Sequence, residues 1–258
     1  MKLVKLILVL LVIYCPVINA ADLPREKRMA DEIVDVILDG EAVFLKANNH
    51  EFLTIYTEAE EANGVAIILH GRGFHPDWQD TVNPLRVGLT ESGWNTLSVQ
   101  MPVLGKQAKY YDYIPLFPEA APRIDAAIKY ARQQGNKKVV LIAHSCGVHM
   151  AMAWIDTWSE NKNAQQIDAF VGIGMGATDY QQPMAKPFPF AEITVPMLDV
   201  YGENDYPAVL LNAHERIQKM TAAGNDKTSQ VSVKGANHYY VDRGGALTKA
   251  VSLWLQTL

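Results

Sequence analysis

The stretch "VVLIAHSCGVHMAMAW", residues 139–154, places one serine between an apolar run and a run of small and apolar residues. A continuous apolar run is typical of a strand that is buried on both faces of a sheet. The residues after the serine fit a helix, so Ser145 stands where a buried strand turns directly into a helix. Ala143 and Gly147 are small enough to let such a tight turn close. We therefore take this stretch as the feature that decides the fold.

Residues 143–147 match the pattern G-x-S-x-G, with alanine in place of the first glycine. In this pattern the serine has a strained backbone and exposes its hydroxyl above the sheet. The amide of Cys146, at the start of the predicted helix, then points to where an oxyanion would form. The pattern predicts that Ser145 is a nucleophile, and the alternative is a serine that caps the helix. We expect Cys146 to be a small buried thiol rather than a nucleophile.

The rest of the chain alternates between strand and helix patterns. Apolar or alternating segments predict strands at 41–46, 51–58, 64–71, 94–100, 137–143, 169–174, 196–202 and 230–235. Helical spacing predicts helices at 25–38, 81–92, 119–134, 146–158, 207–222 and 243–257. This alternation predicts an α/β fold with a mostly parallel central sheet, flanked by helices on both faces. The first two strands should form an antiparallel hairpin at one edge, around Asn48-Asn49.

A nucleophilic serine needs a general base, and the base needs an orienting carboxylate. His238, in "VKGANHYYVD", follows the last predicted strand and precedes the last helix. Asp205, in "MLDVYGENDYP", lies just past the end of a strand and is our choice for the carboxylate. Asp199 lies inside the same strand, where we expect a structural hydrogen-bond acceptor. Asp179, which follows the preceding strand, is a further candidate for the carboxylate.

The order Ser145, Asp205, His238 is the one expected for α/β-hydrolases and differs from other serine-hydrolase folds. "IILHGRGFHPDW" (67–78) also resembles the HG-x-G loop of that superfamily. The segments "HGRGFHPDW", "LTESGWNTLSVQMP" and "GANHYY" resemble those of a bacterial branch of this superfamily that is defined only as a domain of unknown function. The resemblance covers about residues 65–258 and implies an α/β-hydrolase fold with a minimal lid and a catalytic triad. It implies no substrate.

The same resemblance predicts the oxyanion hole: the backbone amides of Arg72 and Cys146. Two alternatives stay open for the Arg72 side chain: contact with a carboxylate on the substrate, or exposure to solvent. Two stretches, 104–122 and 177–190, are rich in tyrosine, phenylalanine and proline and follow strand ends, where ligands bind in such sheets. Their aromatic residues either line an apolar pocket or pack the loops onto the body. We expect the substrate pocket to include Gly71, His144, Tyr111 and Phe188.

Composition bounds the other functions. The chain has 258 residues, of which 49% are apolar and 20% charged, with a net charge of −5, which does not suggest a nucleic-acid partner. Residues 1–20 have the basic start, short apolar centre and terminal small residue of a secretory signal. We therefore predict a single hydrolase domain at 21–258, exported to the periplasm or secreted, with an uncleaved anchor as the alternative. Loss of the signal would leave Cys146 as the one cysteine.

These features together predict a serine hydrolase that cleaves a carboxylic ester, or a related amide or thioester, through an acyl-enzyme. It would act on a small-molecule or lipid-like acyl substrate without a cofactor. The histidine and cysteine spacings do not match a metal-binding motif, so no metal is expected. One alternative is a catalytically inactive binding protein of the cell envelope with this fold. Another is a hydrolase of a large envelope polymer or lipid.

Overall fold

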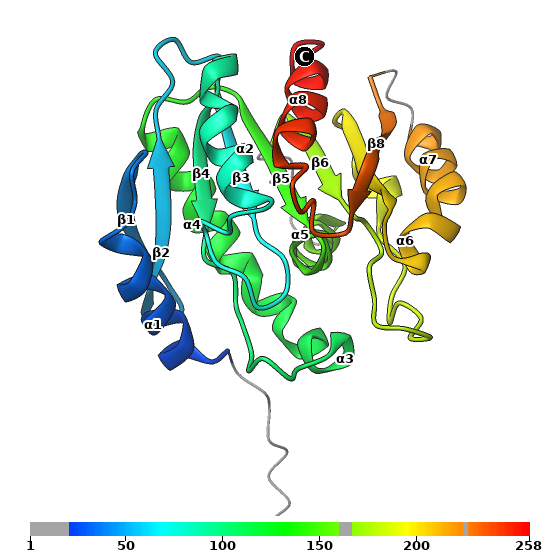
Figure 1. Ribbon diagram of the computed structural model, residues 1–258, viewed down its shortest axis with the longest axis horizontal. Coiled ribbons are helices and arrows are strands. Elements are labelled where there is room, and N and C mark those ends of the chain that lie inside the picture. The colour runs from blue at the N-terminus through cyan, green and yellow to red at the C-terminus, as the bar shows by residue number, and fades with distance from the viewer. Residues whose placement is uncertain (1–20, 160–166, 224–226) are drawn as a thin grey trace, which may run out of the picture.

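A computed structural model describes residues 21–159, 167–223 and 227–258, which build one eight-stranded sheet (Figure 1). The strand order is β1-β2-β4-β3-β5-β6-β7-β8. The pairs β1–β2 and β2–β4 are antiparallel, and all the other neighbours are parallel. The strands are β1 Glu41–Ala47, β2 His50–Thr57, β3 Val65–Leu69, β4 Asn95–Val99, β5 Val139–His144, β6 Ala169–Ile173, β7 Met197–Asn204 and β8 Ser229–Asn237. The predicted α/β fold is confirmed.

The N-terminal hairpin also forms where the sequence predicts it. Asn48 and Asn49 connect β1 to β2, and their φ angles are 47° and 63°. A two-residue turn with both φ angles positive matches the twist of the strands, and asparagine tolerates that conformation better than most residues. The hairpin occupies one edge of the sheet, far from β7 and β8 at the other.

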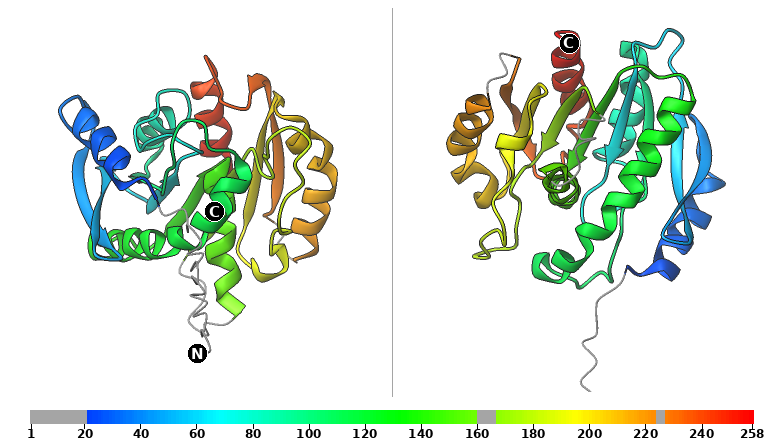
Figure 2. Two further views of the ribbon diagram at one scale, coloured as in Figure 1. Left: turned by 90° about the horizontal axis from the view of Figure 1, so that it is seen from below. Right: turned by 180° about the vertical axis from the view of Figure 1, so that it is seen from behind.

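Helices cover both faces of the sheet. In Figure 1, α2 (Val82–Gly88) and α8 (Gly244–Leu255) lie on the near face, and the view from behind in Figure 2 shows α4 (Ala121–Gln133) and α5 (Cys146–Asp156) on the other. Each face has its own apolar core. Helix α1 (Leu23–Val34) packs separately on the hairpin. Sandwiching the parallel strands in this way explains why their sequences read as unbroken apolar runs.

One of the predicted helices is divided in the structure. The helix predicted at 207–222 is two helices, α6 (Pro207–Leu211) and α7 (Ala213–Ala222). Asn212 separates them, and its side-chain amide donates to the carbonyl oxygen of Ala208, a local bond that competes with helix continuation. The stretch 104–122 contains α3 (Tyr110–Tyr113) and short 3₁₀ turns, whereas 177–190 is almost entirely irregular.

The two irregular stretches follow β4 and β6, and both lie at the carboxyl edge of the parallel strands. Within the described ranges, no helix is long and apolar enough to cross a bilayer. The predicted secretory signal at 1–20 lies outside the described residues. The fold therefore brings the ends of β3, β5, β7 and β8 to one edge, where the predicted site residues lie.

Candidate active site

Ser145 forms the turn between β5 and α5. Its backbone has φ 53° and ψ −117°, a conformation that is strained for any residue with a side chain. Its amide donates to the carbonyl oxygen of Ile173 on the neighbouring strand β6, at 2.8 Å. A Cβ on Gly147 would lie 2.7 Å from the carbonyl oxygen of His70 and 2.8 Å from that of Leu69. Glycine at 147 is therefore what lets α5 start so close to β3.

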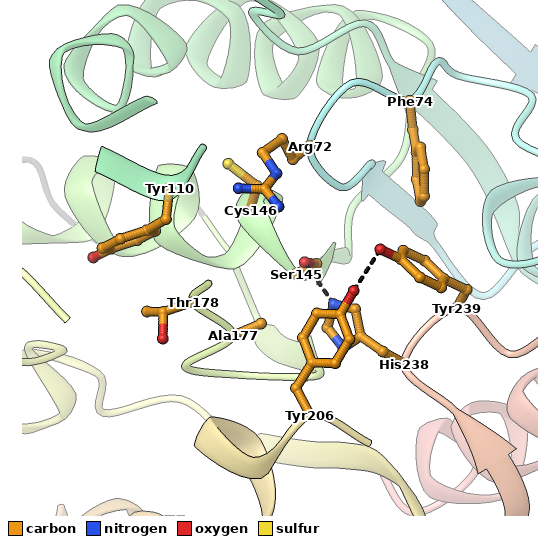
Figure 3. Close-up of a pocket in the computed structure, with 10 residues that line it drawn as sticks. All are labelled: Arg72, Phe74, Tyr110, Ser145, Cys146, Ala177, Thr178, Tyr206, His238 and Tyr239. Atoms are coloured by element: carbon orange, nitrogen blue, oxygen red, sulfur yellow. Dashed lines mark hydrogen bonds between the residues drawn. The ribbon is translucent and has the colours of Figure 1, made fainter. Parts of the chain in front are cut away.

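His238 and Asp205 meet Ser145 from two other loops. Nε2 of His238 lies 2.8 Å from Oγ of Ser145, and its Nδ1 lies 2.6 Å from Oδ1 of Asp205 (Figure 3). Asp205 follows β7, and His238 follows β8. The structure thus brings together the three side chains that the sequence places far apart. Both His238 and Asp205 are buried, so solvent does not compete for the bond between them.

Asp205 is held as a carboxylate. Burial opposes its charge, but a hydrogen bond from His238 and the backbone amides of Tyr206 and Gly202 outweigh burial and lower its pKa. A carboxylate at Oδ1 requires the proton of His238 on Nδ1, which leaves Nε2 free to accept from the hydroxyl of Ser145. The ring of Tyr206 stacks on His238, with centroids 4.2 Å apart, and fixes the plane of the imidazole.

Two hydrogen bonds fix the peptide that joins Gly71 to Arg72 in the loop after β3. The carbonyl oxygen of Gly71 accepts from Nδ1 of His70 at 2.8 Å and from the amide of Phe74 at 3.2 Å. His70 carries its proton on Nδ1 because Nε2 accepts from the amide of Met101. The C=O and N–H of one trans peptide point in opposite directions, so the Arg72 amide points away from these groups. Arg72 and Cys146 both line the pocket at Ser145, and the oxyanion hole formed by their backbone amides stays a prediction.

The side chain of Arg72 meets a carboxylate of the protein itself. Its two terminal nitrogens bind the two oxygens of Asp179 at 2.7 and 2.9 Å. The hydrogen bond from Arg72 lowers the pKa of Asp179, and Asp179 in turn raises the pKa of Arg72. Asp179 also accepts from the amide of Tyr110. Asp179 therefore joins three loops instead of orienting His238.

Asp199 has the structural role expected of it. It is fully buried inside β7, and its carboxylate accepts from Nε of Arg216 and from the side-chain Nε2 of Gln230. Burial raises its pKa, and Arg216 opposes that shift. Cys146 is likewise buried, and burial raises the pKa of its thiol to about 12. A thiol with that pKa is a poor nucleophile at neutral pH.

The comparisons with known proteins agree with this fold. The family model DUF3530, described as a protein of unknown function, matches residues 16–112 and 118–257. The chain belongs to the DUF3530 family. No curated protein matches the sequence.

Solved structures share the α/β-hydrolase fold at low identity. Est1E from Butyrivibrio proteoclasticus is 16% identical, with a TM-score of 0.62 over 85% of this chain and 98% of that one. A dienelactone hydrolase from Anabaena variabilis is 18% identical, with a TM-score of 0.60 over 85% and 97% of the two chains. A lidless serine hydrolase from Xanthomonas campestris is 14% identical, with a TM-score of 0.59 over 86% and 95%. At such identities the likeness shows the fold of this DUF3530 member and not its reaction.

The predicted substrate pocket differs from the pocket at Ser145. None of the four, Gly71, His144, Tyr111 and Phe188, lines the pocket at Ser145. His144 is buried behind the site, where its Nε2 donates to the carbonyl oxygen of His238 at 2.9 Å. Tyr111 is exposed and donates to the carbonyl oxygen of Pro183. A Cβ on Gly71 would lie 2.9 Å from Nδ1 of His144 and 3.3 Å from Cβ of Ser145, so Gly71 lies beside the site. Phe188 lines a neighbouring cavity.

The pocket is lined by residues from the six segments that follow β3 to β8: Arg72, Phe74, Tyr110, Ser145, Cys146, Ala177, Thr178, Tyr206, His238 and Tyr239 (Figure 3). Sequence reasoning missed Tyr206 and Tyr239, whose hydroxyls hydrogen-bond to each other beside His238. Their positions directly after Asp205 and His238 were the available signal. Among the described residues, no cluster of three or more histidine, cysteine, aspartate or glutamate side chains could hold a metal.

Proposed function

We propose that this protein is a serine hydrolase that cleaves carboxylic esters through an acyl-enzyme on Ser145. The observation that carries the proposal is the continuous hydrogen-bonded chain from Oγ of Ser145 through His238 to Asp205, with links of 2.8 and 2.6 Å. Nucleophile, base and orienting carboxylate at these distances form the arrangement used for acyl transfer on several unrelated folds. The strained backbone of Ser145 adds independent support, because it presents the hydroxyl at the apex of the turn.

In this mechanism Oγ of Ser145 attacks the carbonyl carbon of the ester while Nε2 of His238 takes its proton. Asp205 holds the Nδ1–H tautomer and stabilises the imidazolium that forms. His238 then gives the proton to the leaving alcohol, and water repeats the cycle on the acyl-enzyme. The amides of Arg72 and Cys146 stabilise the oxyanion, and one such donor is worth about 3 kcal/mol in a preorganised site. These steps need no cofactor.

The first test is covalent labelling of the purified protein with a fluorophosphonate, which reacts only with an activated serine. We expect the wild type to be labelled at Ser145 and the Ser145→Ala variant to remain unlabelled. Hydrolysis of p-nitrophenyl acetate should fall by roughly 10⁴-fold or more in the same variant, because a triad without its nucleophile retains little activity. Ser232→Ala removes an exposed hydroxyl on β8 and serves as the matched control.

Absence of label on folded wild-type protein would overturn the proposal and favour a catalytically inactive binding protein. The proposal covers a small-molecule or lipid-like acyl substrate. We also propose that the protein is exported to the periplasm or secreted by means of residues 1–20. N-terminal sequencing of the protein recovered from the cell envelope or medium tests this separately.

A further inference from the structure

A second cavity borders the catalytic pocket. It lies between α5 and the two aromatic-rich stretches and has a volume of about 350 Å³, whereas the pocket at Ser145 has about 40 Å³. Tyr110 lines both cavities, so the two are adjacent at this residue. The larger cavity is lined mainly by apolar and aromatic side chains, among them Ile114, Phe117, His149, Met152, Ala153 and Phe188.

The volumes show that the pocket at Ser145 cannot hold a whole organic ester. Pockets that enclose small organic ligands have volumes of roughly 300–1,000 Å³. About 40 Å³ accommodates the reacting carbonyl group and little more. The rest of a substrate must therefore extend out of this pocket, and the neighbouring cavity is in the right size range.

The chemistry of the triad indicates which part of the ester goes where. His238 must protonate the leaving alcohol, so the alcohol lies on the side of His238, Tyr206 and Tyr239. The acyl group then extends to the opposite side of Ser145. Figure 3 shows Tyr110 on that opposite side. Tyr110 also lines the larger cavity.

The lining of the larger cavity suits an uncharged occupant. Its rings pack against one another, with His149 stacked on Phe117 at 5.4 Å between centroids. Burial lowers the pKa of His149 to about 4, so the imidazole is neutral, and its Nε2 donates to the carbonyl oxygen of Ala177. The charged side chains Lys186 and Asp156 line the cavity too, and they form an ion pair with each other.

We propose that this cavity receives an apolar acyl group of the substrate and that Tyr110 is the partition that turns aside to admit it. The proposal rests on the ester hydrolysis proposed above. The backbone amide of Tyr110 is fixed to Asp179, and its hydroxyl accepts one hydrogen bond from the amide of Ala185 at 3.0 Å. The buried ring also packs against the rings of Tyr111, Phe117 and His149. Rotation of the ring about its side-chain bonds would exchange that bond and these ring contacts for contacts with the substrate, and would join the two cavities.

The test compares kcat/KM for p-nitrophenyl acetate, octanoate and benzoate. Ala153→Phe fills the cavity from α5, and we expect it to lower the octanoate-to-acetate ratio by roughly tenfold or more, since each methylene bound in an apolar pocket contributes strongly. Tyr110→Ala removes the partition and should raise the same ratio. The benzoate-to-acetate ratio shows whether the cavity also takes an aromatic acyl group. Ala222→Phe, at an exposed position on α7, is the matched control.

A second blocking variant controls for the case in which Ala153→Phe misfolds. Ala185→Phe fills the cavity from an exposed loop position instead of the helix and should lower the octanoate-to-acetate ratio in the same direction. An unchanged ratio in both blocking variants would overturn the role of the cavity, and a lowered ratio in Tyr110→Ala would overturn the role of the partition. Fluorophosphonate labelling separates the two proposals. If wild-type Ser145 is labelled but the ratios do not change, ester hydrolysis stands and the acyl site does not.

Discussion

Gly174 leaves the space that the ring of His238 occupies. A Cβ at this position would lie 2.8 Å from Cε1 of His238 and 3.0 Å from its Nδ1. Gly174 also has φ 62°, which a residue with a side chain adopts only at a cost. Any larger residue would push the imidazole away from either Ser145 or Asp205, so this glycine positions the proposed base without touching substrate.

We therefore expect Gly174→Ala to lower kcat/KM for p-nitrophenyl acetate by roughly 100-fold, because small displacements of a catalytic group have effects of that size. Gly135→Ala is a close control, because Gly135 has φ 84° and a Cβ added there would meet no other atom within 4 Å. Both variants should lose about 1 kcal/mol of unfolding free energy, since both place alanine at a positive φ. Equal activities in the two variants would contradict a positioning role for Gly174.

The sequence predicts Ser145, Asp205 and His238 because each follows a recognisable strand and their order along the chain is informative. Gly174 could not be found in that way, since its requirement comes from the ring of a distant residue. The same limit applies to Arg72, whose partner Asp179 lies in an irregular loop with no periodicity to place it. Contacts between loops depend on how distant segments fold together, whereas a motif depends only on residues that are close together in the sequence.

At the scale of elements, the turn of the N-terminal hairpin depends on its two asparagines. Asn49 has φ 63°, and a β-branched residue at such a φ is a strong steric outlier. We expect Asn49→Val to lower the free energy of unfolding by about 1–2 kcal/mol, the typical cost of a left-handed residue that carries a Cβ. Asn49→Gly should leave stability equal or higher, because glycine adopts this conformation freely.

Urea unfolding followed by circular dichroism measures both variants. Esterase activity per folded molecule should not change in either, since the hairpin is at the far edge of the sheet from β7 and β8. A Val variant as stable as the Gly variant would show that the turn does not impose the positive φ in solution.

Element prediction succeeded where burial dictates the pattern and failed where local side-chain bonds intervene. The parallel strands β3, β5 and β6 are buried along their whole length, so their apolar runs mark them clearly. The helix expected at 207–222 carries helical spacing throughout, yet it breaks at Asn212. No hydrophobic pattern encodes such a break, because it results from one side chain that bonds to the backbone.

At the scale of the whole molecule, three buried neutral histidines make stability depend on pH. Burial lowers the pKa of His70 to about 3, of His144 to about 3 and of His149 to about 4, from an ordinary value of 6.5. Below pH 6.5 the unfolded chain therefore binds protons that the folded chain does not. The free energy of unfolding falls as the pH drops from 6.5, and each histidine's contribution levels off near its own lowered pKa.

Each of these histidines should contribute a slope of about 1.4 kcal/mol per pH unit between pH 6 and pH 5. His149→Gln removes one titrating group and keeps an amide that can donate to the carbonyl oxygen of Ala177. Its unfolding free energy is measured in urea at pH 7, 6 and 5. Between pH 6 and pH 5 it should fall less steeply than that of the wild type, by about 1.4 kcal/mol per pH unit. The substitution also changes packing, which alters the unfolding free energy by the same amount at every pH. The prediction therefore concerns how steeply the unfolding free energy changes with pH and not its value at pH 7. Parallel curves would show that His149 takes up no additional proton on unfolding, and hence that it is not held neutral in the folded protein.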